Sequence, residues 1–225
     1  MAKILERRKA ILLRNKGKTY SEIRGIIKVS KSTLSLWLKF YPLSTRQLQR
    51  VNKNKYRAIE KFRLTMRKKR EKRLDQYYQA QQKRLLPFSR KELLIAGLLL
   101  YWGEGNKASS HTISLNNNDP GVLKFALYWL LKGLLIPKSK IKIYLHLYKD
   151  MDIEKEITYW SKMLDISKAN FIKPYIKESS RSEIDQKGFG HGTCGVTVHD
   201  TKIKETILMG IKGISDYYGK KIADI

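Results

Sequence analysis

ELLIAGLLLYWGEGN, residues 92–106, is the stretch that decides how the second half of this chain folds. Residues 93–102 are apolar on every side of a helix, so the pattern predicts a helix buried by the rest of its domain or by a second copy of the chain. Ten residues are too few to cross a bilayer, which needs about 20. The stretch is therefore predicted to be a core helix of a globular domain.

A carboxylate stands at the end of this helix. Glu104 lies between Gly103 and Gly105, where the helix is expected to stop. Gly97 precedes Glu104 by two helical turns, so the two residues point the same way, and Ala96 beside it would let another backbone approach closely. The simplest interpretation is a helix C-terminus with an exposed acid.

LYWGEGNK, residues 100–107, resembles the terminal half of the LAGLIDADG motif, in the glutamate form used by some intein and homing-endonuclease members. The resemblance implies that the motif helices of two subunits pack together and that their terminal acids hold Mg²⁺ or Mn²⁺. Such metal ions activate water and stabilise the leaving oxygen when DNA is cut. Because the chain has one copy of the motif, Glu104 would be half of the metal site and catalysis would need a homodimer.

The charge of the chain is extreme and unevenly placed. The formal net charge is +27 at pH 7, and residues 1–91 hold 28 Lys and Arg against 5 Asp and Glu. Such a density favours a polyanion, most commonly nucleic acid, because each neutralised phosphate releases counterions. Binding to an anionic membrane surface would require an amphipathic helix with a broad apolar side, which the basic stretch lacks.

Cysteine usage and the amino terminus favour a reducing compartment. Cys194 is the single cysteine, which excludes an internal disulfide. The amino terminus has charges where a secretion signal needs an apolar run. The expected location is cytoplasmic, in association with the nucleoid.

Residues 3–39 are predicted to form three short helices. The first spans 5–15, a capping box of Thr19 and Glu22 opens the second, and Ser30 caps the third. The stretch 20–39, YSEIRGIIKVSKSTLSLWLK, is similar to the resolvase-like helix-turn-helix family. That resemblance implies five buried positions: Ile23, Ile27, Val29, Leu34 and Trp37.

The helix-turn-helix resemblance assigns DNA contacts to the third helix. In this module the second helix of the pair lies in the major groove, with its amino-terminal residues at base edges. The residues nominated are Lys31, Ser32, Thr33 and Ser35 for bases and Lys39 for phosphate. The alternative is a three-helix unit used only for packing.

A basic stretch, residues 43–90, is predicted to join a helix-turn-helix domain at 1–42 to a second domain at 91–225. Apolar residues recur at three- and four-residue steps, so at least part of it is a helix, in the longest case from Leu48 to Leu85. The alternative is a solvated or partly disordered linker. The thin apolar seam comprises Leu48, Val51, Ile59, Phe62 and Met66, and the candidate phosphate contacts are Arg67, Lys68, Lys69 and Arg70.

From residue 91 onward helices alternate with strands. Strands are predicted at 112–116, 140–148, 171–177 and 193–199, and helices after Asp119, at 153–164 and at 202–218. The fold class is α+β, and the element order of this part resembles the α/β saddle of the LAGLIDADG family. Strand 140–148 alternates strictly, with an exposed side formed by Lys142, Tyr144, His146 and Tyr148.

Basic side chains on or beside the sheet could assist chemistry by polarising solvent or holding phosphate. We assign Lys142 and Lys173 to catalysis with Glu104, and Lys107 and His146 to DNA binding, with Lys177 also available. Side chains that point outward from a strand are as readily just solvated. Zinc is a weaker possibility: His191, Cys194 and His199 supply three donors, whereas structural zinc takes four and mostly paired cysteines.

The leading hypothesis is a homodimeric, metal-dependent, site-recognising endonuclease of homing type that binds duplex DNA. The rival is a transcriptional regulator that binds DNA without cutting it. Glutamate in place of aspartate favours the regulator, as does the Ala96–Gly97 pair, which falls two residues earlier than the family pattern. Structured RNA is a third possible partner. Nucleotide hydrolases and dehydrogenases are not supported, because their phosphate-binding motifs are missing from the sequence.

Overall fold

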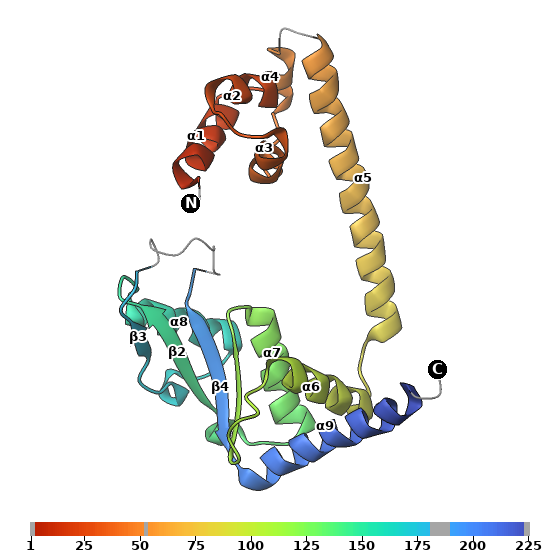
Figure 1. Ribbon diagram of the computed structural model, residues 1–225, viewed down its shortest axis with the longest axis vertical. Helices are drawn as coiled ribbons and strands as arrows, with labels where there is room; N and C mark the ends of the chain where they lie inside the picture. The colour runs from red at the N-terminus through yellow and green to blue at the C-terminus, as the bar shows by residue number, and fades with distance from the viewer. Residues whose placement is uncertain (1–2, 52–53, 181–189, 223–225) are drawn as a thin grey trace. The chain divides into compact units, whose positions relative to one another are not determined.

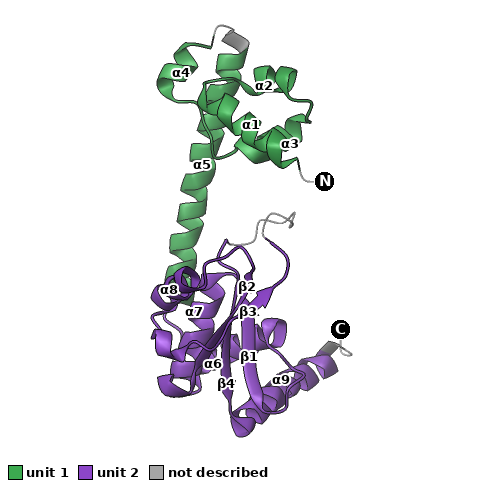
Figure 2. Cartoon of the chain, turned by 90° about the vertical axis from the view of Figure 1, so that its left-hand side faces the viewer, with its two compact units in different colours: residues 1–86 green, residues 87–225 purple. Residues whose placement is uncertain are grey.

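The computed structural model describes residues 3–51, 54–180 and 190–222. The chain divides into two compact units, Met1–Leu86 and Pro87–Ile225 (Figure 2). The first unit is all helical and the second mixes helices with a small sheet, which confirms the α+β class. The boundary places most of the basic stretch with the amino-terminal unit.

The first unit consists of five helices among the residues described: α1 (Ile4–Asn15), α2 (Tyr20–Ile26), α3 (Lys31–Leu38), α4 (Thr45–Gln49) and α5 (Asn54–Leu85) (Figure 1). The predicted caps are confirmed, since Thr19 and Glu22 form a capping box and the Ser30 side chain accepts from the Thr33 amide. Of the five positions predicted to be buried, three lie in the core of α1–α3 and two pack half-buried against it. The buried ones are Ile23, Ile27 and Leu34; the half-buried ones are Val29 and Trp37.

Part of the basic stretch is a helix, as predicted, but it does not reach the longest extent considered, from Leu48 to Leu85. Leu48 belongs to the short helix α4, whose Ser44 capping box opens a separate element, and α5 begins at Asn54. Leu48 and Val51 are buried with Leu43 in a small cluster of their own. The remaining residues of the predicted seam, Ile59, Phe62 and Met66, are exposed. A thin apolar stripe on a basic helix therefore does not become a core.

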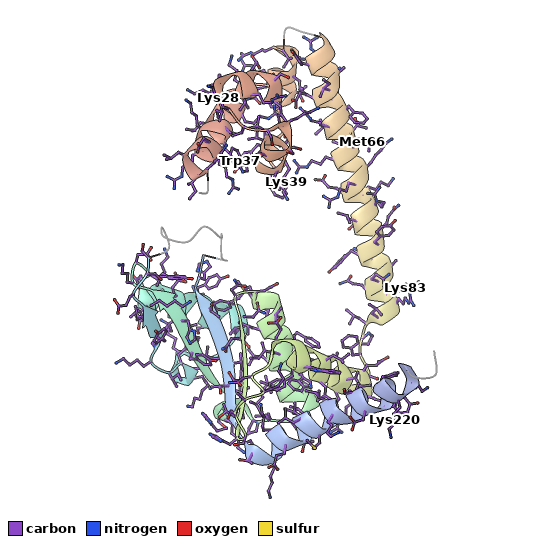
Figure 3. The ribbon with its side chains drawn as sticks, in the orientation of Figure 1. Lys28, Trp37, Lys39, Met66, Lys83 and Lys220 are labelled. Carbon is purple, nitrogen blue, oxygen red and sulfur yellow. The ribbon has the colours of Figure 1, made fainter. Side chains whose placement is uncertain are left out.

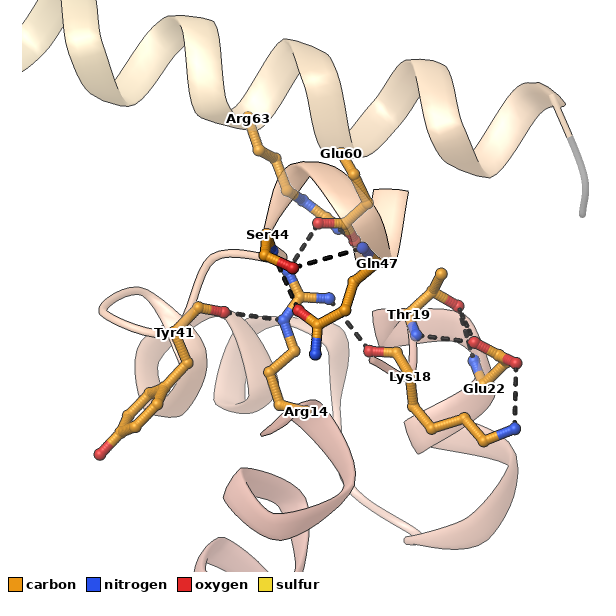
Figure 4. A network of polar contacts seen from close by, with 9 residues as sticks. All are labelled: Arg14, Lys18, Thr19, Glu22, Tyr41, Ser44, Gln47, Glu60 and Arg63. Atoms are coloured by element: carbon orange, nitrogen blue, oxygen red, sulfur yellow. Dashed lines mark hydrogen bonds and ion pairs between the residues drawn. The ribbon is translucent and has the colours of Figure 1, made fainter. Parts of the chain in front are cut away.

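A buried polar network fixes the first half of α5 on the other helices of its unit (Figure 4). Arg14 donates to the Glu60 carboxylate at 2.6 Å and also to the backbone oxygens of Tyr41 and Lys18. The second Glu60 oxygen accepts from Arg63 at 2.7 Å. The buried carboxylate is thus paired with two guanidinium groups, as a buried charge requires. From Lys68 to Leu85 the helix is exposed on all sides.

The second unit is built on a four-stranded sheet in the order β1-β4-β2-β3. Strand β4 is antiparallel to both of its neighbours, and β3 is parallel to β2. The elements in chain order are α6 (Arg90–Glu104), β1 (Thr112–Asn117), α7 (Pro120–Tyr128) continued by a π-helix (Trp129–Gly133), β2 (Lys142–Tyr148), α8 (Ile153–Leu164), β3 (Tyr175–Lys177), β4 (Thr193–His199) and α9 (Thr201–Ile222), with short 3₁₀ turns at Lys138–Lys140 and Lys168–Asn170.

The strict alternation of strand β2 is confirmed, and it separates a buried face of the sheet from an open one. Ile143, Leu145 and Leu147 are fully buried, whereas the side chains between them are half-buried. Helices α7 and α8 lie on one face of the sheet (Figures 1 and 2). The third predicted strand is shorter than 171–177: Phe171 makes only an isolated bridge to Ile143, and pairing begins at Tyr175. No helix in the described ranges is both long and apolar enough to cross a membrane.

Helix α6 is only half covered by its own domain. Leu93, Gly97 and Tyr101 are buried, and the close neighbour of Gly97 is Trp129 of the same chain, whose indole would lie 2.0 Å from an added Cβ. The space beside Gly97 is therefore filled by a side chain from the π-helix of the same domain and not by another backbone. On the opposite side, Ile95, Leu99 and Trp102 are exposed at helical spacing.

Candidate nucleic-acid interface

Helix α3 presents an exposed polar amino terminus. Lys31, Ser32 and Ser35 are exposed and Thr33 is half-buried, while Leu34 on the inner side is fully buried. The alternation of buried and exposed positions arises because the apolar residues at helical spacing pack on α1 and α2. Four predicted base-contacting residues thus lie on one short helix whose core side is fixed.

Two of these hydroxyl groups are already engaged within the cap. The Ser30 side chain hydrogen-bonds to Ser32 at 2.8 Å and to Thr33 at 2.7 Å. Within the described part of the chain, no side-chain hydrogen bond is recorded for Lys31 or Ser35. Lys39, which follows the helix, places its ammonium 4.7 Å from the ring centroid of Phe40. Lys31 and Ser35 are therefore the two exposed side chains of the predicted base-contacting set that are not engaged in the cap.

The basic run on α5 lies on the exposed half of that helix. Lys68, Lys69 and Arg70 are exposed, whereas Arg67 is half-buried and pairs with Glu71 at 2.7 Å. Exposed ion pairs of this kind contribute little to folding stability, so Arg67 could leave Glu71 and pair with a phosphate instead. The run therefore provides positive charges whose side chains are not fixed in one conformation by neighbouring residues.

The open face of the sheet is polar and aromatic. Among the strand residues described, it carries no carboxylate. Its side chains come from all four strands: Thr112, Ser114 and Asn116 on β1, Thr193, Thr197 and His199 on β4, Lys142, Tyr144, His146 and Tyr148 on β2, and Tyr175 and Lys177 on β3. Of these, Ser114 and Thr197 are buried by their neighbours. A face of this composition can place aromatic rings and ammonium groups against a nucleic acid.

An aromatic row crosses this face. The His146 ring lies 5.4 Å from both the Tyr144 and the Tyr175 ring centroids. Gly195 makes room for Tyr144, since a Cβ there would lie 2.3 Å from the tyrosine ring, and the Tyr144 hydroxyl hydrogen-bonds to Ser114 and Asn116. Burial, and then the nearby Lys177 ammonium, lowers the pKa of His146. The lowered pKa favours the neutral form of His146, the central ring of the row.

Glu104 lies at the end of α6, beside the carboxyl end of β1. Its carboxylate is exposed and accepts from the Asn117 side chain at 3.5 Å. Gly103 on its amino-terminal side has open space around it. The Lys107 ammonium donates to the Trp102 carbonyl at 2.8 Å, so this predicted DNA-binding lysine also caps the helix end.

A fully buried lysine fixes the loop that follows Glu104. Lys204 on α9 donates to the Tyr101 hydroxyl at 2.6 Å and to the Asn106 carbonyl. The Asn106 amide donates to Ser114 on β1 at 2.8 Å. The position of Glu104 relative to β1 is therefore held by α9 as well as by α6.

The structure does not bring the predicted catalytic lysines to Glu104. Asn117 is level with Leu145 across the sheet, whereas Lys142 lies three residues further along β2, roughly 10 Å at strand spacing, and two strands away. Lys173 precedes β3 on the opposite edge of the sheet and is exposed. His146, in contrast, lies at the same end of the sheet as Asn117.

The three possible zinc donors do not converge. His191 pairs with the buried Glu156 carboxylate at 2.7 Å and stacks on Tyr159 at 3.5 Å. Cys194 is buried in the core, which raises the pKa of its thiol, and His199 contacts Thr112. No group of three or more such donors gathers around a metal position within the described ranges. Residues 188–195, whose sequence GFGHGTCG predicts a turn that enters a strand, lie partly outside the described residues.

Sequence reasoning missed the residues that act through packing. Gly195 sits in a strand without a turn signal, and Lys204 and Glu60 are charged residues in amphipathic helices, where exposure is the default expectation. An isolated glycine within a strand pattern is a known sign of close approach and could have flagged Gly195.

Comparisons with protein-family models, curated proteins and solved structures found no match for this chain.

Proposed function

We propose that this chain is a sequence-recognising duplex-DNA-binding protein that reads bases through α3 and holds phosphates through its other basic side chains. The observation that carries the proposal is the exposed amino terminus of α3, where Lys31 and Ser35 project from a helix whose other side is fixed in the core. A net charge of +27 supplies the sequence-independent part of the affinity.

The open face of the sheet supports a second contact surface for the same duplex. It offers Lys142, Lys177 and an aromatic row, and the described strand residues place no repelling carboxylate there. Arg67, Lys68, Lys69 and Arg70 on α5 add phosphate contacts. Such contacts position a protein on DNA, whereas α3 selects the sequence.

Selection from a randomised duplex library tests this function. Purified full-length chain is expected to enrich a defined sequence, and the selected duplex should displace structured RNA of matched length at 0.15 M salt. Arginine-rich and lysine-rich proteins bind many polyanions, so enrichment of a sequence is the informative result. Failure to enrich any sequence, or stronger binding of the RNA, would remove the proposal.

A second candidate function is metal-dependent cleavage by a homodimer. Two observations favour it: Glu104 is exposed at the end of α6, and Ile95, Leu99 and Trp102 form an uncovered apolar stripe along another side of the same helix. Pairing of this stripe with the same stripe of a second chain would give the homodimer that a two-metal site with one Glu104 from each chain requires. Sites of this kind would take Mg²⁺ or Mn²⁺.

Nicking of a supercoiled plasmid that carries the selected sequence separates cutting from binding alone. With Mg²⁺ or Mn²⁺, wild type is expected to nick and Glu104→Gln to bind equally well without nicking. Leu99→Glu should stop nicking and leave a monomer in sedimentation, because like charges would then face each other across the stripe. Tight specific binding without nicking by any of these proteins would instead support a non-cleaving regulator.

A further inference from the structure

A hollow of about 530 Å³ lies between the end of α3 and the first half of α5, entirely within the first unit. One side is lined by Ser35, Lys39 and Phe40, and the other by Phe62, Met66 and Arg67. Figure 3 labels Lys39 and Met66 on the two sides. Its volume is in the range of sites that enclose a ligand or a few partner side chains.

Three of the large apolar side chains that line the hollow are exposed. Phe40, Phe62 and Met66 are 69%, 64% and 47% exposed. Phe62 and Met66 are one helical turn apart on α5, so both project from the same side of that helix. Large apolar side chains that line a concave surface together mark a binding site, and a phosphate backbone has nothing to place against them.

Cationic side chains also line the hollow. They include Lys39, Arg63, Arg67, Lys69, Arg70 and Arg73. Its two carboxylates, Glu60 and Glu71, already accept from arginines of the same chain. The net charge around the hollow is therefore positive, which selects an acidic occupant. The first unit of a second copy, which holds most of the excess of Lys and Arg, would be repelled from it.

We propose that this hollow docks an acidic amphipathic helix of a partner protein. Apolar side chains spaced three or four residues apart on the partner would pack against Phe40, Phe62 and Met66, and its carboxylates would face Lys69, Arg70 and Arg73. Because Ser35 and Lys39 line the hollow, the docked helix would also exclude DNA from that end of α3. This exclusion rests on the proposed DNA binding, whereas the docking itself does not.

Fluorescence anisotropy with two labelled synthetic peptides tests the docking. One 18-residue peptide has Leu and Phe at helical i, i+3, i+4 and i+7 positions with Glu elsewhere; the other has the same composition in scrambled order. The full chain is expected to bind the amphipathic peptide at least about tenfold more tightly at 0.15 M salt. Phe62→Gln with Met66→Gln should abolish this preference, whereas Tyr77→Gln, a matched change on the exposed half of α5, should preserve it.

Equal binding of the two peptides by wild type would overturn the proposal, because the hollow would then act only as a polyanion patch. Retention of the preference by the double variant would overturn it too. If the double variant weakened selected duplex as much as peptide, the hollow would be part of the DNA surface instead. The exclusion is supported if the chain prefers the amphipathic peptide when no duplex is present and if the selected duplex then displaces that peptide. If peptide and duplex bind at the same time, the exclusion is overturned but the docking still stands.

Discussion

At the scale of single residues, two glycines of α6 have opposite structural roles although they stand six residues apart in the same helix. A Cβ at Gly97 would lie 2.0 Å from the Trp129 indole, whereas nothing lies within 4 Å of one at Gly103. Gly97→Ala should therefore destabilise the second unit by about 1–3 kcal/mol through overpacking. Gly103→Ala should be neutral or stabilise by up to about 1 kcal/mol through helix propensity.

Urea unfolding of dilute protein, followed by tryptophan fluorescence, measures both glycine variants. The order of stabilities should be Gly103→Ala, wild type, Gly97→Ala. Equal stability of the two variants would mean that the contact between α6 and Trp129 is not the tight one described.

His146 should make the stability of the second unit depend on pH below its ordinary pKa. Burial and then Lys177 lower the pKa of His146 from its ordinary 6.5, so folding disfavours the protonated ring. The stability is fully present above pH 6.5 and is lost as pH falls from there through the lowered folded pKa. Wild type should therefore lose stability relative to His146→Gln between pH 7 and pH 5. A relative gain of wild type at acidic pH would contradict the lowered pKa.

Several residues of the candidate site could be identified from sequence because their signals are local. Capping boxes, Glu104 between two glycines and the alternation of β2 depend on neighbours along the chain. The sequence could not place Lys142 and Lys173 relative to Glu104 of the same chain, because strand register and strand order decide which side chains meet. Both depend on pairing between distant segments, which a pattern along one segment does not contain.

At the scale of elements, the buried pair of Arg14 and Glu60 anchors α5 on α1. Glu60→Gln would leave the Arg14 guanidinium buried without its charged partner, which costs about 3–5 kcal/mol for such pairs. Glu71→Gln removes an exposed pair with Arg67 and should cost about 0.5 kcal/mol or less. Thermal unfolding of the two variants should differ by many degrees; similar midpoints would show that the buried pair does not fix α5.

The predicted boundaries of helices and strands agree best with the structure where the periodic pattern of apolar residues is strongest. Helix α8 and strand β4 span the predicted residues, since amphipathic and alternating patterns were unbroken there. The long basic helix was placed correctly beyond Asn54 but does not reach back to Leu48, because Leu48 and Val51 fit the seam by spacing while packing on Leu43 in three dimensions. For helix α6, the apolar pattern predicted burial by its own domain or by a second copy of the chain. Its own domain covers one side only, and the other side is exposed in the single chain.

At the scale of the whole molecule, the charge asymmetry predicts a steep salt dependence of DNA binding. Each phosphate contact contributes close to one unit to the slope of log affinity against log salt concentration. Lys69→Ala and Arg70→Ala should each lower this slope by about 1 while leaving sequence preference unchanged. Lys220→Ala, a matched loss of charge on α9, should leave the slope nearly unchanged if that helix does not contact DNA. A slope unaffected by the α5 variants would remove α5 from the interface.

The most direct test of the central claim is the ratio of dissociation constants for the selected duplex and a scrambled duplex of the same length. Wild type should prefer the selected duplex by about 10³-fold or more at 0.15 M salt. Lys31→Ala combined with Ser35→Ala should reduce that ratio by about tenfold to 10³-fold, with scrambled-duplex affinity reduced only slightly by the lost charge. A ratio near one for wild type, or an unchanged ratio in the double variant, would contradict base recognition by α3.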